Sequence, residues 1–198
     1  MIRIRINGRG GQGGKMMAEL LAMMLYGNSG EAGKYPFISS SPTFGPERRG
    51  APVDAFVRLS NSEIRERGSF QDAADIVIVL DADLAIHTDV GKGLKDGGLL
   101  LVNSMLAPTD NVFKKYVQRV VVATVDADTI AVRNGLGNRT TPIVNTALLG
   151  AFIRISTLAS LPALFQFIET DIRKKVEANK KAAQEAFNSV QHNGGNVL

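Results

Sequence analysis

The chain contains no cysteine and no tryptophan, and 6% of its 198 residues are aromatic. Without cysteine it forms no disulfide and offers no thiolate, the usual ligand of iron–sulfur clusters and structural zinc. A redox centre of that kind must therefore be carried by a partner protein. No apolar run approaches the roughly 20 residues that cross a bilayer, so we expect a soluble protein without a membrane span.

Composition and length indicate one domain that spans residues 1–198. Hydrophobic residues make up 44% of the chain and charged residues 21%, a balance typical of folded soluble proteins, and domains usually have about 100–200 residues. The N-terminus alternates Ile2, Ile4 and Ile6 with arginines, which predicts a strand and lacks the apolar core of a signal peptide. We therefore expect a cytoplasmic protein.

The formal charge of +4 comes partly from basic residues near the C-terminus. They alternate with acidic residues at helical spacings, as on the solvated face of a helix. A nucleic-acid-binding protein more often shows a basic stripe with interleaved aromatic residues. We expect no nucleic-acid partner.

Four segments after the N-terminal strand have the patterns of further strands. Ile76–Leu80, Leu99–Val102 and Val120–Val125 are continuous apolar runs, typical of strands that helices cover on both faces. In Val53–Leu59 apolar and polar residues alternate, which indicates a strand nearer an edge of the sheet.

Residues 14–26 predict the first helix. Their apolar side chains recur at positions that share one helical face. The residues of this expected buried face are Met16, Leu20, Met23 and Met24.

Three more helices are expected toward the C-terminus. Thr141 and Ser160 are each followed closely by proline, and this combination predicts a helix start with a capping hydroxyl. The basic segment after Asp171 predicts a final amphipathic helix, and residues 192–198 predict a loose tail or a strand-like arm on a partner. The expected fold class is α/β, with three layers, a mostly parallel or mixed sheet, helices on both faces and a helical C-terminus.

A glycine-rich turn follows the first strand. Gly8, Gly10 and Gly13 have the G-x-G-x-x-G spacing of dinucleotide-binding loops, and such a turn aims backbone N–H groups and the positive end of a helix at one point. A dinucleotide site also needs an acidic residue about 20 positions further on, at a strand end. Glu31 follows a turn cluster instead. NAD or FAD, another anion, a close backbone contact and a purely structural turn remain open.

The stretch Ser39–Val53 is rich in proline, glycine and serine and has no apolar periodicity. Long loops of this kind are often functional. Arg48 and Arg49 are suited to pair with carboxylate or phosphate in a forked geometry. The alternative is a surface loop in which these arginines are solvated or bridge to Glu47.

Two Asp-Ala-Asp segments, Asp81–Asp83 and Asp126–Asp128, each follow an apolar strand. Carboxylates at strand ends can bind a metal or carry out acid–base chemistry. We favour a simpler role, in which one aspartate of each pair caps the next helix. His87 has no second histidine near it, so we expect it to be structural. Without a recognisable catalytic motif, we expect no catalytic residue and no metal ligand in this chain.

Four segments in register together resemble the gamma subunit of the 2-oxoacid:ferredoxin oxidoreductases. They are IRINGRGGQGGKMMAELLA, SPTFGPERRGAPVDAFVRLS, ADIVIVLD and TTPIVNTALLGAF, and they extend over nearly the whole chain. A similar unit forms an internal domain of single-chain pyruvate:ferredoxin oxidoreductase. The form FGPERRGAPV is closer to the pyruvate and branched-chain branch of the family than to the 2-oxoglutarate branch.

The resemblance implies a multi-subunit enzyme that converts a 2-oxoacid and coenzyme A to acyl-CoA and CO2 and passes electrons to ferredoxin or a similar acceptor. In the family, thiamine diphosphate with Mg²⁺ lies between the alpha and beta subunits, and [4Fe–4S] clusters lie in the beta and delta subunits. A gamma subunit alone would bind none of these groups. Its implied role is to support the alpha subunit and to contribute to the coenzyme A site.

The family motifs fall on the turn Gly8–Gly13, on Gly45–Val53, and on Pro142, Asn145 and Gly150. By this resemblance, one set of residues contacts coenzyme A or the alpha subunit. The set is Gly8, Gly10, Gly11, Gln12, Gly13, Arg48 and Arg49.

Three alternatives remain open, and in one of them the chain is a purely structural interaction module whose glycine-rich turn contacts only protein. The small subunit of indolepyruvate:ferredoxin oxidoreductase carries a similar domain and needs one large partner chain. A free-standing Rossmann-type oxidoreductase would bind NAD by itself.

Overall fold

The computed structural model describes residues 1–27, 35–42, 50–70 and 72–194. The strands of the larger sheet are β1 (Ile2–Arg9), β2 (Phe37–Pro42), β3 (Pro52–Ser60), β4 (Ala74–Val79), β5 (Leu94–Asn103), β6 (Val121–Val125) and β9 (Gln191–His192). The helices are α1 (Gly14–Gly27), α3 (Ala82–His87), the 3₁₀ turn η1 (Asn111–Phe113), α4 (Ala127–Arg133), α5 (Asn145–Ser156), α6 (Leu161–Asp171) and α7 (Val176–Ser189). Strands β7 (Gly137–Asn138) and β8 (Thr141–Pro142) form a separate ribbon.

The large sheet has the strand order β2-β3-β1-β4-β5-β6-β9. Strands β1, β4, β5 and β6 are parallel to their neighbours within this group. The outer strands pair antiparallel: β3 with β1, β2 with β3, and β9 with β6. The prediction of a mostly parallel or mixed sheet is confirmed in its mixed form, and the continuous apolar runs form the central strands, as expected for strands buried on both faces.

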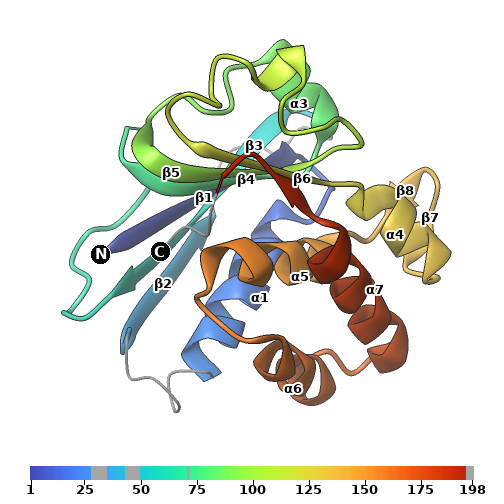
Figure 1. Ribbon diagram of the computed structural model, residues 1–198. Helices are drawn as coiled ribbons and strands as arrows, with labels where there is room; N and C mark the ends of the chain where they lie inside the picture. The colour runs from blue at the N-terminus through green and yellow to red at the C-terminus, as the bar shows by residue number, and fades with distance from the viewer. Residues whose placement is uncertain (28–34, 43–49, 71, 195–198) are drawn as a thin grey trace.

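Helices α1, α5, α6 and α7 cover one face of the sheet (Figure 1). Ile4 and Ile6 of β1 are fully buried against them, because alternate side chains of a strand point to the same face. All residues of α5 except Arg154 are buried. A side chain at Gly150 would overlap the backbone carbonyl of Ala183, so α5 and α7 pack backbone to backbone.

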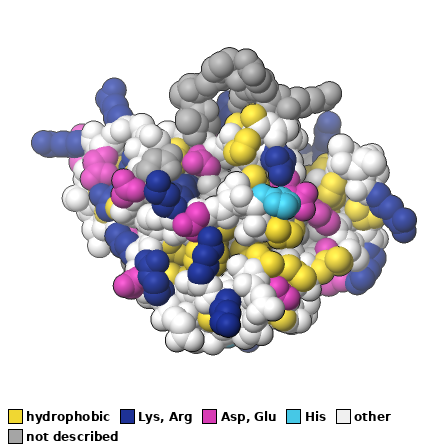
Figure 2. Space-filling model, turned by 90° about the horizontal axis from the view of Figure 1, so that it is seen from above, with side chains coloured by type: hydrophobic (Ala, Val, Ile, Leu, Met, Phe, Trp, Pro, Cys, Tyr) yellow, Lys and Arg dark blue, Asp and Glu magenta, His cyan; other side chains and the backbone are white. Residues whose placement is uncertain are grey.

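The opposite face has a thinner cover, formed by α3, η1 and their connecting loops (Figure 1). A second apolar cluster, which includes Val77, Leu100 and Phe113, is buried there. Helices therefore lie on both faces, as predicted, but most of the helical mass is on one. Figure 2 looks onto the thinner side, where Lys and Arg side chains are interspersed with Asp and Glu.

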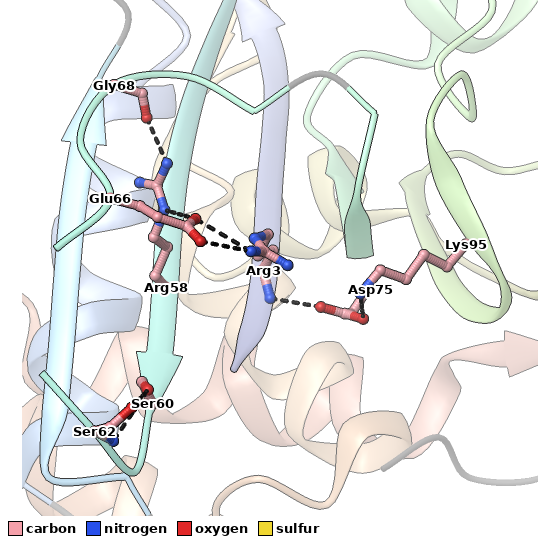
Figure 3. A network of polar contacts seen from close by, with 8 residues as sticks. All are labelled: Arg3, Arg58, Ser60, Ser62, Glu66, Gly68, Asp75 and Lys95. Atoms are coloured by element: carbon pink, nitrogen blue, oxygen red, sulfur yellow. Dashed lines mark hydrogen bonds and ion pairs between the residues drawn. The ribbon is translucent and has the colours of Figure 1, made fainter. Parts of the chain in front are cut away.

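Strands β1 and β3 present arginines to this thinner face. Arg58 of β3 is 2% exposed and donates to the carbonyl of Gly68 at 2.7 Å. Glu66 accepts from Arg3 at 2.9 Å and lies 3.7 Å from the Arg58 guanidinium (Figure 3). We call residues 61–70, which follow β3, the crossing segment. Its Phe70 packs against Phe56, with 4.8 Å between ring centroids, so the segment closes this part of the sheet.

The predicted helix over residues 14–26 is confirmed as α1. Its predicted buried face is correct at Met24 and partly at Leu20 but wrong at Met16 and Met23. Met17, Leu21 and Met24 are buried, whereas Met16 and Met23 are exposed. This helix carries apolar residues around most of its circumference, so two faces shifted by one residue had the same spacing. Packing against β1, β2 and β3 selects the face of Met17.

The predicted helix start at Thr141–Pro142 is also wrong. These residues form β8, and α5 begins at Asn145 without a side-chain cap. The Thr141 backbone N–H donates to Asn138 Oδ1 at 2.9 Å, and its hydroxyl lies 3.1 Å from the same oxygen. The hydroxyl is thus engaged in the ribbon and does not cap a helix.

Of the remaining C-terminal predictions, the two helices are confirmed and the loose tail is wrong where the structure describes it. Ser160 caps α6 through the Ala163 N–H, and α7 is the expected final helix. Residues 192–194 are not a loose tail, because β9 pairs with β6 and Asn193 accepts from the Val122 N–H at 2.7 Å. Residues 195–198 lie outside the described residues. In the described parts of the chain, no helix has both the length and the apolar character that crossing a bilayer requires.

Candidate functional site

The glycine-rich turn connects β1 to α1 at the carboxyl end of the parallel strands. Gly11 and Gly13 have φ values of 94° and 84°, a conformation that favours glycine. Gly8 lies against Leu80, where an added Cβ would be 3.1 Å from Leu80 Cδ1. The Gly10 N–H donates to the carbonyl of Ala51 at 2.9 Å. Glycine therefore has a structural cause at Gly8, Gly11 and Gly13, and the backbone of Gly10 ties the turn to Ala51.

Side chains of the turn converge on one carboxylate. Asp81 Oδ2 accepts from Gln12 Nε2 at 2.7 Å and from Arg9 Nε at 2.9 Å. Gln12 Oε1 accepts from the Arg9 N–H at 2.7 Å, so the glutamine bridges its own turn to the end of β4. Asp81 also caps α3, because its Oδ1 accepts from the Asp83 N–H at 2.9 Å.

A cleft of about 550 Å³ opens beside this turn. Its volume falls within the range of small-molecule sites, about 300–1,000 Å³. The lining residues are Gly11–Gly13, Met16, 80–83, Asp128 and 139–145. The turn, the ends of two strands and the segment that leads into α5 thus meet at one edge, where open α/β sheets commonly bind ligands.

Asn103, at the end of β5, holds the far side of the cleft. Its buried amide donates to the carbonyl of Leu80 at 3.0 Å and to Asp128 Oδ1 at 2.9 Å, and its oxygen accepts from the Ala127 N–H at 2.9 Å. Three segments that are distant in sequence are tied together by this single side chain.

The charged residues of the described cleft lining are mainly acidic, with Asp81, Asp83 and Asp128 against Arg139. Burial raises the pKa of Asp128, and the negative charges of Asp126 and Asp81 add to this increase, whereas the Asn103 hydrogen bond opposes it. The carboxylate of Asp128 is therefore held in an environment that disfavours its charge.

The capping role predicted for the Asp-Ala-Asp segments is confirmed for Asp81 and for Asp126, which accepts from the Thr129 N–H at 3.0 Å. Within the described residues, no three side chains of His, Cys, Asp or Glu gather as a metal site. His87 is the last residue of α3 and is exposed; its structural role stays a prediction.

The structure brings together part of the predicted site. Gly11, Gln12 and Gly13 line the cleft, whereas Gly8 and Gly10 support the turn from behind. Arg48 and Arg49 lie outside the described residues. Sequence patterns alone did not assign Asp128 or Asn103 to this place. Their positions after β6 and at the end of β5 were an available signal, since parallel strands end at one edge.

Comparison with known proteins gives the family. The family described as pyruvate ferredoxin/flavodoxin oxidoreductase matches residues 3–189. A pyruvate synthase subunit PorC of Methanothermobacter marburgensis is 40% identical over 98% of this chain and 100% of that protein. The pyruvate/ketoisovalerate oxidoreductases common subunit gamma of Thermococcus kodakarensis is 41% identical over 95% of this chain and 96% of that protein.

A solved structure agrees with these matches. The crystal structure of the pyruvate oxidoreductase subunit PORC from Thermotoga maritima superposes with a TM-score of 0.76, at 30% identity and with 98% of both chains covered. None of these relatives is named as an indolepyruvate enzyme or as a free-standing NAD enzyme. The chain belongs to the pyruvate ferredoxin/flavodoxin oxidoreductase family, as a gamma-type subunit.

Proposed function

We propose that this chain is the single-domain gamma subunit of a cytoplasmic enzyme that oxidises a 2-oxoacid of the pyruvate or branched-chain type. The reaction converts R-CO-COO⁻ and HS-CoA to R-CO-S-CoA, CO2 and one proton, and passes two electrons to ferredoxin or a similar acceptor. The observation that carries this proposal is the full-length match to a named pyruvate synthase subunit. The described residues offer a binding surface without a catalytic motif, so activity is expected only in the assembled enzyme.

The proposal is tested by producing a tagged chain in its native cells and purifying the complex from the soluble fraction. Identification of the copurified chains by mass spectrometry is followed by an assay of ferredoxin reduction with coenzyme A and pyruvate or 2-oxoisovalerate. We expect alpha, beta and delta-type subunits and coenzyme A-dependent activity. A chain that purifies alone and binds NAD tightly would contradict the proposal.

The cofactors are assigned to the partner subunits. Cluster thiolates cannot come from a chain without cysteine. The [4Fe–4S] clusters are therefore proposed to be held by the beta and delta-type subunits. Thiamine diphosphate and Mg²⁺ are proposed, from the family resemblance, to lie between the alpha and beta subunits. A brown complex whose iron stays with those subunits after this chain is removed is the expected result.

We further propose that the glycine-rich turn, with Arg48 and Arg49, contacts coenzyme A or the alpha subunit. The support is the turn at the start of the 14-residue helix α1, beside a cleft of ligand size. Replacing Arg48 and Arg49 by alanine in the assembled enzyme should raise the KM for coenzyme A if they bind its phosphates. Arg65→Ala, which removes an exposed arginine, is the matched control.

A further inference from the structure

The cleft beside the glycine-rich turn combines two features that call for a covering partner. The first is exposed apolar surface on its rim: Met16 is 55% exposed and Ile143 is 51% exposed, although both line the cleft. Large apolar side chains that face a shared hollow in this way mark interaction sites, because water must otherwise hydrate them. The remainder of the wall is also partly apolar, with Leu80, Pro142 and Val144.

The second feature is unbalanced charge. Asp81 has a cationic partner in Arg9. Among the described residues, neither Asp83 nor Asp128 forms an ion pair with lysine, arginine or histidine. Burial raises the pKa of Asp128, and the nearby negative charges of Asp126 and Asp81 add to that increase. A cation brought into the cleft would oppose that increase.

We infer that the cleft receives a segment of a partner subunit that places a lysine or arginine side chain between apolar side chains. The apolar part would cover Met16 and Ile143, and the cation would lie between Asp83 and Asp128. This inference rests on the proposed function, which supplies the partner chains. It selects protein rather than coenzyme A as the occupant of the described cleft. With Asp81 paired to Arg9, phosphates there would face Asp83 and Asp128 and only one further arginine of the lining, Arg139.

Because the chain has no cysteine, a single introduced thiol can report whether a partner subunit covers the cleft. Ile143→Cys introduces the single thiol of this chain, and Glu177→Cys does so at an exposed position in the first turn of α7. Each assembled complex is treated with a maleimide, and labelling of this chain is measured by mass spectrometry. We expect the thiol at position 143 to react at least tenfold more slowly than the thiol at position 177, without added coenzyme A. Equal rates would overturn the inference, and so would protection only when coenzyme A is present.

A second test addresses charge. Asp83→Asn and Asp128→Asn together remove both charges. The amide oxygen at position 128 can still accept the hydrogen bond from Asn103 Nδ2. In a complex reconstituted from purified, identified subunits, we expect the double variant to bind its partner subunits with at least tenfold lower affinity. That affinity should also depend less on salt concentration than the wild-type affinity does. Glu177→Gln is the matched control. An affinity within twofold of the wild type would overturn the inference.

The two proposals fail in different ways. If the chain does not copurify with oxidoreductase subunits, the proposed function fails before either variant is made. If the wild-type complex assembles and is active but the double variant changes only the KM for coenzyme A, the function stands and the cleft binds coenzyme A. That last outcome overturns the inference alone.

Discussion

The two faces of strands β1 and β3 are closed by different physical means. On one face Ile4, Ile6 and Val57 are fully buried beneath helices, and this contact is apolar. On the other face Arg58 is equally inaccessible but is closed over by the crossing segment, through Glu66, Gly68 and Phe70. The same strands thus contribute both kinds of packing, because alternate residues point to opposite faces.

The difference predicts unequal responses to substitution. Apolar packing depends on volume and loses free energy when a cavity forms. Polar packing depends on keeping every partner, because a buried charge without one is costly. Burial lowers the pKa of Arg58, and the nearby Glu66 opposes that decrease. The arginine face should therefore be the more sensitive to small changes in charge, and the helical face the more sensitive to loss of volume.

The largest effect is expected for Phe152→Ala on the helical face. Phe152 lies in α5 and is fully buried in the helical core. Its truncation should lower the free energy of unfolding by about 3–5 kcal/mol, measured by urea denaturation. Phe37→Ala is the matched control, because Phe37 is 41% exposed on the edge strand β2. A loss at Phe152 no larger than that at Phe37 would contradict the assignment of the core.

Arg58→Ala tests the other face. It removes the hydrogen bond to Gly68 and the stacking on Phe70, where the guanidinium carbon is 4.7 Å from the ring centroid. We expect a loss of about 2–3 kcal/mol in the free energy of unfolding. Arg65→Ala, at a side chain that is 86% exposed, should change it by less than about 0.5 kcal/mol.

Arg58→Met separates volume from charge at the same position. Because an apolar side chain of similar length keeps much of the packing, it should recover at least half of the loss seen with alanine. If methionine and alanine lower the free energy of unfolding equally, the polar contacts alone hold the crossing segment.

Glu66→Gln should have a smaller effect, about 1 kcal/mol or less, since the Glu66 side chain is 49% exposed. The more sensitive measurement is trypsin cleavage after Arg65 and Arg67 in the crossing segment. We expect faster cleavage in Glu66→Gln than in the control Glu63→Gln, whose side chain is 68% exposed. Equal cleavage rates would show that Glu66 does not hold the segment.

The sequence predicted β1, β3, β4, β5 and β6, because each has an apolar pattern of its own. It was wrong about residues 39–42, which it placed in a loop; these residues belong to β2 and are held by pairing with β3. It failed where two local patterns were equally compatible with the sequence, as for the two faces of α1 and for the Thr141 hydroxyl, which bonds to Asn138. The face of α1 is settled by tertiary packing against β1, β2 and β3, whereas the Thr141 contact is a local alternative to helix capping.

Only part of the candidate site was predicted from the sequence. The glycine spacing located the turn, because positive φ values at Gly11 and Gly13 require that residue type. The wall opposite, with Asn103 and Asp128, depends on the order of β4, β5 and β6 in the sheet. That order is a property of the assembled fold. The sequence offered only the positions of these residues at or after strand ends, which place them at one edge without giving their neighbours.

The smallest effect on the free energy of unfolding is expected for Asp89→Asn, and this effect should depend on pH. The hydrogen bond from the Tyr116 hydroxyl, at 2.6 Å, lowers the pKa of Asp89, with a further contribution from Lys115. A lowered pKa in the folded state stabilises the protein above the unfolded pKa, and the contribution is lost as pH falls through the folded value. Asp89→Asn should therefore cost less than about 1 kcal/mol near pH 7, because this side chain is largely exposed, and the cost should be smaller near pH 3. Urea denaturation at both pH values measures this, and Phe152→Ala, which removes no titratable group, should cost the same at each. A cost for Asp89→Asn that is equally large at the lower pH would assign the effect to hydrogen-bond geometry and not to charge.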